Sequence, residues 1–401
     1  MYYVSLLKKE ASELSSGGRG KILIAIAFGW FLSISVRIVY PALLPHLRSA
    51  YGLTLTTAGL LLTVLWIAYG LGQLPGGVLG DWVGERILLI TSSIISAGTL
   101  TLVVIAESAF ILFAATALFG LGTALYGVAR FTILKDLYSD RLGTATGVTM
   151  AVGDLGNALM PPTAGFIAVA LGWRFGLGFA IPLFLIAAVA LWLTLPSKSS
   201  LESGSKSLKE SLDFGTVLPT IRQPAVAQAT FLLVLWEVIL QAFMGFFPTY
   251  LIEVKGLSTQ LAAGLFGLYF ALGVFIKPVA GRLYDRTGVR NPLLVILSAT
   301  AVGLVALPFF DEIWLFVIVT ALISGLLGYE TVVISDLTRR LPNEARGVNL
   351  GALRTIYIIL GALSPVAFGA IADRGYFSEA FFIYAALAVV GVVFVAYYVE
   401  Y

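Results

Sequence analysis

Long apolar runs recur along the whole chain and constrain its fold more than any other feature. A helix needs about 20 apolar residues to cross the hydrocarbon core of a bilayer. Of all residues, 59% are hydrophobic and only 12% are charged, whereas soluble domains carry about 25% charged residues and cannot bury so much apolar surface. The pattern predicts an all-α integral membrane protein with twelve spans, near 22–46, 56–80, 87–106, 109–134, 143–171, 175–195, 225–251, 258–283, 291–310, 313–337, 347–371 and 377–398.

A polar stretch separates the sixth span from the seventh. It runs from Pro196 to Gln223 and is rich in serine and lysine, which is typical of a linker. We therefore expect an N-terminal segment at 1–20, a six-helix bundle at 21–195, a linker at 196–224 and a second six-helix bundle at 225–401.

The distribution of basic residues predicts the orientation, because Lys and Arg favour cytoplasmic loops. An even number of spans places both termini on one side, and most basic residues of the connections fall on that side. The exceptions are Arg48, Arg174, Lys255 and Arg374. We expect a multi-pass protein of the cell membrane with the N-terminal segment, the linker and both termini in the cytoplasm.

Two short turns share one pattern. The first runs from Gly77 to Arg86 and the second from Gly281 to Arg290, 204 residues apart (281 − 77). Both carry Gly, Leu, Asp, Gly and Arg at the same internal positions. A repeat at about half the chain length predicts two halves of one design.

The pattern G-x-L-x-D-R-x-G-R-R between two spans resembles the signature of the major facilitator superfamily of secondary transporters. The resemblance implies two pseudo-symmetric six-helix bundles around a central site, lined by spans 1, 4, 7 and 10. It also implies that the turns act as a conformational latch, with Trp82 and Glu85 departing from the usual basic residues of the first copy. The latch residues would be Gly77, Asp81, Gly84 and Arg86, and Gly281, Asp285, Arg286, Gly288 and Arg290.

Ionisable residues within spans are functional candidates, because each costs about 3 kcal/mol at the centre of a bilayer. Arg37 is about 16 residues into span 1, which is roughly 24 Å along a helix. Its repeat partner is Gln241, one turn from Glu237. A planar, always charged donor suits a carboxylate or phosphate. We predict a substrate site of Arg37, Tyr40, Glu237, Gln241 and Glu330; the alternative is that Arg37 forms a structural ion pair with Asp154 or Glu237.

Three carboxylates are candidates for proton coupling, because a buried carboxylate can carry a proton. They are Asp154, Glu237 and Glu330. The alternatives are that Asp154 pairs with a buried arginine and that Glu330 pairs with Arg130 across the halves, as a gate or for mutual neutralisation. Lys277 and Arg354 lie nearer the cytoplasmic ends of their spans, where we expect both to snorkel towards the interface.

The sequence lacks the residues that several kinds of catalytic and binding site require. The chain has no Cys and one His, which excludes cysteine catalysis and argues against a metal site. It also lacks the P-loop that ATP-driven transport needs. We expect no enzyme activity, no cofactor and no nucleic-acid partner, and a monomer whose partners are the lipid bilayer, protons and a small-molecule substrate.

The leading hypothesis is a proton-coupled secondary transporter of a small organic or inorganic anion, working by alternating access. One alternative is a proton-driven exporter of lipophilic or drug-like compounds, and another is a non-transporting membrane sensor on the same fold. An unpaired Arg37 facing the cavity favours an anion, whereas Arg37 against Asp154 favours the exporter.

Overall fold

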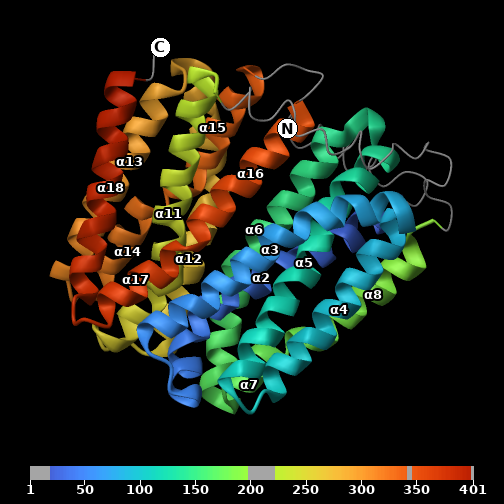
Figure 1. Ribbon diagram of the computed structural model, residues 1–401, viewed down its shortest axis with the longest axis horizontal. Helices are drawn as coiled ribbons and strands as arrows, with labels where there is room; N and C mark the ends of the chain where they lie inside the picture. Colours follow the sequence, from blue (N-terminus) through green and yellow to red (C-terminus); the bar gives the residue numbers. More distant parts are fainter. Residues whose placement is uncertain (1–18, 197–221, 341–345, 399–401) are drawn as a thin grey trace, which may run out of the picture.

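The computed structural model describes residues 19–196, 222–340 and 346–398, and within them all regular structure is helical. The first half contains α2 (Arg19–Tyr51), α3 (Leu55–Val83), α4 (Glu85–Ile105), α5 (Ala109–Leu137), α6 (Leu142–Leu171), α7 (Trp173–Gly178) and α8 (Ala180–Thr194). The second contains α11 (Pro224–Glu253), α12 (Thr259–Thr287), α13 (Arg290–Ala306), α14 (Ile313–Ile323), α15 (Leu326–Arg340), α16 (Arg346–Ala362), α17 (Ser364–Ala372) and α18 (Phe377–Tyr398). Figure 1 shows the two halves side by side as separate bundles.

Within the described residues, eleven helical segments are long and apolar enough to cross a membrane. Helix α6 is not among them, although its 30 residues are about 45 Å long at 1.5 Å per residue. Asp154, Asn157 and several glycines make it less apolar. Because α6 packs along α2 and α12, we count it as the twelfth crossing, and the predicted twelve-helix fold is confirmed.

The duplication is visible in the hydrogen bonds of the two halves. Arg86 Nη2 donates to the Trp192 carbonyl at 2.8 Å, and Arg290 Nη2 donates to the Ala396 carbonyl at 2.7 Å. Both donor and acceptor are 204 residues further on in the second half (290 − 86 and 396 − 192). The positive-φ glycines of the described residues also form pairs: Gly52 with Gly256, Gly84 with Gly288, and Gly172 with Gly375.

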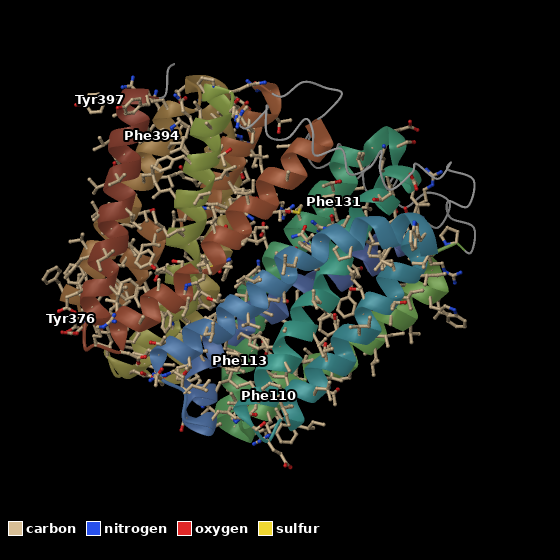
Figure 2. The ribbon with its side chains drawn as sticks, in the orientation of Figure 1. Phe110, Phe113, Phe131, Tyr376, Phe394 and Tyr397 are labelled. Atoms are coloured by element: carbon tan, nitrogen blue, oxygen red, sulfur yellow. The ribbon has the colours of Figure 1, made fainter. Side chains whose placement is uncertain are left out.

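The perimeter of the molecule is apolar, as lipid contact requires. Figure 2 shows Phe110 and Tyr397 at the edge of the structure, where their side chains are 82% and 81% exposed. Aromatic residues in a soluble protein are mostly buried. The exposed aromatic side chains therefore indicate faces that lie against a bilayer.

We call the end at which α2 begins and α18 ends the inner end, and the opposite end the outer end. The bundles pack closely at the α6–α12 and α3–α17 crossings because glycines remove side chains there. A Cβ on Gly267 would lie 2.4 Å from Pro162 Cγ, and one on Gly59 would lie 2.2 Å from the Pro365 carbonyl oxygen. These crossings hold the two bundles together.

The predicted domain boundaries stay a prediction. Most of the expected linker at 196–224 and nearly all of the N-terminal segment at 1–20 lie outside the described residues. What the structure describes is the two helical halves that these segments would flank.

Candidate functional site

A cavity of about 160 Å³ lies between the bundles and takes its walls from both. Four ionisable residues of the second half and two of the first line it: Glu237, Lys277, Glu330 and Arg354, with Arg37 and Asp154. Its aromatic lining consists of Trp30, Trp66, Tyr69, Trp236, Phe270 and Tyr357. A small, largely apolar cavity with a few convergent charges is typical of a ligand site.

Arg37 of α2 lies over two aromatic rings. Its guanidinium lies 3.5 Å from the centroid of the Tyr69 ring and 5.1 Å from that of Trp66, and Nε donates to the Ser33 carbonyl at 2.9 Å. Nη1 is buried and has no hydrogen-bond partner. Arg37 forms no ion pair with a carboxylate of the described residues, so the alternative of a structural pair with Asp154 or Glu237 is wrong.

Glu237 and Gln241 lie together on α11, one turn apart. Gln241 Nε2 donates to Glu237 Oε1 at 2.8 Å, and both side chains are buried and line the cavity. The Glu237 side chain fits against Gly361 of α16, where a Cβ would come within 2.1 Å of Glu237 Cγ. A buried carboxyl with a neutral amide partner is therefore part of the wall.

Glu330 of α15 and Arg354 of α16 form the second charged group in the second half. Tyr357 donates its hydroxyl proton to Glu330 Oε1 at 2.9 Å. Arg354 Nε is buried without a hydrogen-bond partner; Glu330 and Glu237 act on this guanidinium electrostatically, but from beyond ion-pair distance. The expectation that Arg354 snorkels is wrong, because the side chain faces the cavity.

Asp154 of α6 has a partner that the sequence did not reveal. Lys277 Nζ of α12 lies 2.7 Å from each of its carboxylate oxygens. This ion pair joins the two bundles at the cavity wall. Two expectations are corrected by it: Asp154 does not pair with an arginine, and Lys277 does not snorkel away from the interior.

Arg130 of α5 is buried but does not pair with Glu330. Its guanidinium lies 3.3 Å from the centroid of the Trp30 ring, and Nη2 donates to Met150 Sδ at 3.3 Å. The gate or neutralising pair expected between Arg130 and Glu330 is therefore absent among the described ion pairs. Glu330 instead has Tyr357 as its partner.

Two sets of predicted site residues lie away from the cavity. Tyr40 is buried in the first bundle against Phe119, with ring centroids 6.0 Å apart. At the inner end, Asp285 pairs with Arg339 of its own bundle at 3.4 Å, and Gly84 and Gly288 turn the chain with φ of 82° and 74°. The surroundings of Gly77 and the side chain of Asp81 lie outside the described part. A Cβ on Gly281 would lie 4.0 Å from Thr331 of its own bundle, and Arg286 takes part in none of the ion pairs between described residues.

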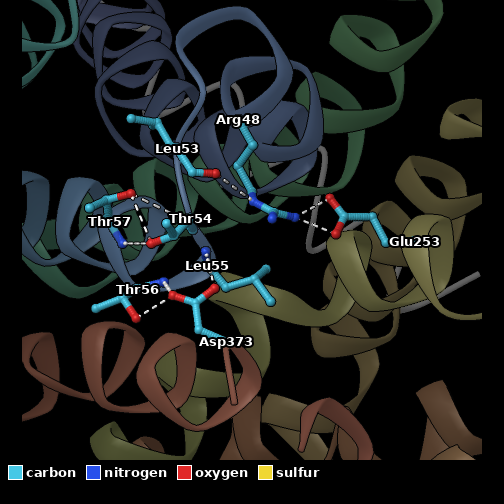
Figure 3. A network of polar contacts seen from close by, with 8 residues as sticks. All are labelled: Arg48, Leu53, Thr54, Leu55, Thr56, Thr57, Glu253 and Asp373. Atoms are coloured by element: carbon cyan, nitrogen blue, oxygen red, sulfur yellow. Dashed lines mark hydrogen bonds and ion pairs between the residues drawn. The ribbon is translucent and has the colours of Figure 1, made fainter. Parts of the chain in front are cut away.

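The outer end is closed by polar contacts between the bundles, which sequence reasoning missed (Figure 3). Arg48 of α2 forms an ion pair with Glu253 of α11, in which Arg48 Nη1 donates to both carboxylate oxygens. Asp373, just after α17, accepts hydrogen bonds from the N–H groups of Leu55 and Thr56 at 2.7 and 2.8 Å. These are unsatisfied donors of the first turn of α3, so a carboxylate of one bundle caps a helix of the other.

The hydrogen bonds of Asp373 also shift its titration. Burial raises the pKa of this carboxyl, but the bonds from Thr56 and Leu55 outweigh it and hold the pKa below its usual value. A carboxylate that accepts several N–H bonds is favoured in its charged form. Two features of the sequence point to this contact. Thr54, a helix-capping residue type, lies at the start of one span, and Asp373 lies just after the end of another.

The fold and the cavity define a helical membrane protein built from two repeated bundles around a shared polar site. The family model of the Major Facilitator Superfamily matches residues 25–357. The chain therefore belongs to the Major Facilitator Superfamily, and it is a membrane transporter rather than an enzyme, as the signature turns predicted.

Relatives and a solved structure agree with this assignment. The chain is 26% identical to a probable sulfoacetate transporter of Cupriavidus necator over 93% of this chain and 92% of that protein. It is 25% identical to a hexuronate transporter of Bacillus subtilis over 86% of each. A crystal structure of a nucleoside transporter matches with a TM-score of 0.81 at 12% identity, covering 94% of this chain and 100% of the other, which shows a common fold.

Proposed function

We propose that this protein carries a small organic or inorganic anion across the cell membrane by alternating access of its two bundles. The observation that carries the proposal is that Arg37 and Arg354, one from each bundle, line the same cavity without an ion pair to any described carboxylate. Two guanidinium groups in the interior of a membrane protein need negative charge to offset their desolvation. A bound anion supplies it.

The position of the two arginines supports a mechanism for the movement. A ligand shifts a conformational equilibrium only by its differential affinity for the two states. An anion that contacts Arg37 and Arg354 together binds best when the bundles approach each other around it. Binding therefore favours closure of the inner end, after which opening of the outer end completes the exchange.

Proton coupling fits the same cavity. Asp154 is already neutralised by Lys277, which leaves Glu237 and Glu330, each bonded to a neutral partner. Both carboxylates compete with a substrate anion for Arg354. Protonation removes this competition, so a proton and an anion bind with positive coupling. We infer symport of an anion with a proton, with Glu237 as the main carrier because it is the more buried of the two.

The names of the relatives support an anionic substrate, since sulfoacetate and hexuronates carry a carboxylate or sulfonate. The alternative of an exporter for lipophilic compounds is favoured by the aromatic lining, but it predicted Arg37 against Asp154. Arg37 faces the cavity and Asp154 is bonded elsewhere. The excess of basic residues at the inner end supports a cytoplasmic location of that end and of both termini.

The test is uptake of radiolabelled sulfoacetate and glucuronate into proteoliposomes under an imposed pH gradient. We expect saturable uptake that the gradient accelerates, and loss of uptake in Arg37→Gln and Arg354→Gln. Arg222→Gln, which removes an exposed arginine before α11, is the matched control and should retain uptake. Uptake unaffected by Arg37→Gln and Arg354→Gln would contradict an anion site. Wild-type protein that binds these anions without moving them would support the membrane sensor instead.

A further inference from the structure

We propose that Arg130 and Trp30 form a second anion-binding site, on the inner side of the site around Arg37 and Arg354. Its ligand is a small monovalent anion, either a carboxylate or a halide. The proposal extends the proposed function by adding a step to the route of the anion, but the site itself binds whether or not transport occurs. Two buried cationic or N–H donor groups without adequate acceptors point to it.

The Arg130 guanidinium lies over aromatic rings but has few acceptors for its N–H groups. Its Cζ is 3.3 Å from the centroid of the Trp30 ring and 4.2 Å from that of Phe131, while the residue is only 1% exposed. A guanidinium presents its five N–H donors in the plane of the group, and stacked rings cannot accept them there. Nε and Nη1 have no partner, and Nη2 reaches only the sulfur of Met150, which is a weak acceptor.

A second donor lies beside Arg130. The indole Nε1 of Trp30 is buried and has no acceptor. It lies against Gly153 of α6, where an added Cβ would come within 2.4 Å of the nitrogen. Among the described residues no carboxylate forms an ion pair with Arg130, so the region carries an uncompensated positive charge.

The central cavity gives access to these groups. Trp30 and Met150 both line it, and Met150, which covers Arg130 on one side, is 38% exposed. Methionine is unbranched and adapts its shape readily. A rotation of the Met150 side chain replaces its sulfur with an anion as the acceptor for Arg130.

The two arginine sites follow each other along the molecule. Trp30 precedes Arg37 by seven residues on α2, which is about 10 Å towards the inner end. Gly127 of α5 is close to both sites. A Cβ added to it would lie 3.1 Å from the Tyr69 hydroxyl and 3.8 Å from Trp30. The Arg37–Tyr69 stack and the Trp30–Arg130 stack are thus neighbours, and an anion leaving Arg37 towards the inner end meets Arg130 next.

The test measures anion binding without transport. Purified full-length protein in nanodiscs is titrated with sodium chloride or sodium acetate, replacing sodium sulfate, whose anion is divalent, at constant ionic strength, and the unfolding temperature is recorded. We expect a saturable rise of about 2 °C in the wild type at high occupancy. Because the site around Arg37 and Arg354 also binds anions, the comparison uses the double variant Arg37→Gln with Arg354→Gln. The rise should persist in that double variant and in Arg222→Gln, and it should disappear when Arg130→Gln is added to the double variant.

The outcomes separate the possibilities. A rise with acetate shows that the site accepts the carboxylate of a substrate in transit, whereas a rise with chloride alone assigns it to an inorganic anion. A rise that is lost in Arg37→Gln but kept in Arg130→Gln overturns the proposal, as does a wild type that responds to neither salt. If Arg130→Gln does not fold, Arg130→Lys replaces it; a binding midpoint unchanged from the wild type then overturns the proposal as well. Loss of uptake has no bearing on this readout, so the proposed function fails or stands separately.

Discussion

The two halves of the molecule share a scaffold but not a set of charges. Arg86 and Arg290 make the same hydrogen bond at the same repeat position. In the cavity, however, Arg37 of the first half corresponds to Gln241 of the second. Beside the cavity the first half has the buried Arg130 where the second has Glu330. Duplication therefore preserved the residues that form turns and helix contacts, whereas the charges in and beside the cavity diverged between the halves.

The largest expected effect comes from removing this asymmetry at its centre. Arg37→Gln makes the two repeat positions alike and should reduce uptake about 10- to 150-fold, because a charge-assisted bond is worth about 1.5–3 kcal/mol and Arg37 has no substitute. The exchange Arg37→Gln with Gln241→Arg should not restore uptake, since an arginine at 241 pairs with Glu237 one turn away. Restored uptake would show that only the number of cations matters.

The ion pair between the halves should have the next largest effect. Lys277→Gln leaves Asp154 charged without a partner and should lower the free energy of unfolding by about 2 kcal/mol, less than for a fully buried pair because both side chains are partly exposed. The double variant with Asp154→Asn should recover most of this loss. Thermal unfolding of the four proteins of the cycle measures the coupling, and additive losses would contradict a direct pair.

The outer closure should respond more weakly to substitution and to pH. Asp373→Asn weakens the hydrogen bonds that this residue accepts from the first turn of α3 by about 1 kcal/mol. The fraction of molecules open at the outer end should therefore rise about fivefold. The chain has no cysteine, so labelling of Ile38→Cys with an impermeant maleimide measures the exposure. The contribution of Asp373 is present above the ordinary carboxyl pKa and is lost as pH falls through its lowered pKa, so labelling of the parent should rise only in strong acid. Labelling independent of pH in that range argues against Asp373 as the lock.

The smallest effect tests the shared scaffold. Thr54 and Ser258 are 204 residues apart (258 − 54), and each caps a helix by accepting from the N–H three residues on. Thr54→Ala and Ser258→Ala should each cost about 1 kcal/mol, measured by thermal unfolding. Thr54 lies beside the Asp373 contact. If Thr54→Ala lowers the free energy of unfolding well below the value for Ser258→Ala, the additional loss comes from the outer closure.

Much of the fold was predictable because hydropathy and the repeat act locally. The apolar runs predicted the spans, and the paired turns predicted the duplication. The site was less predictable, because a pattern along one helix does not reveal which face meets the cavity. Lys277 near a span end fits an interface and a cavity equally well, and its partner Asp154 is 123 residues away. Arg130 was expected to need a carboxylate, but aromatic faces supply part of its stabilisation.

The contact between Asp373 and α3 has a consequence for control of the resting state. The Thr56 hydroxyl donates to Asp373, but the other two donors are the main-chain amides of Leu55 and Thr56. Every residue except proline supplies such an amide, so ordinary substitutions at these positions leave both amides in place. Leu55 is the first residue of its helix, the one helical position that tolerates proline well. Leu55→Pro therefore deletes one donor while the helix stays intact, and offers a route to a form biased towards the opposite access state without touching any charge.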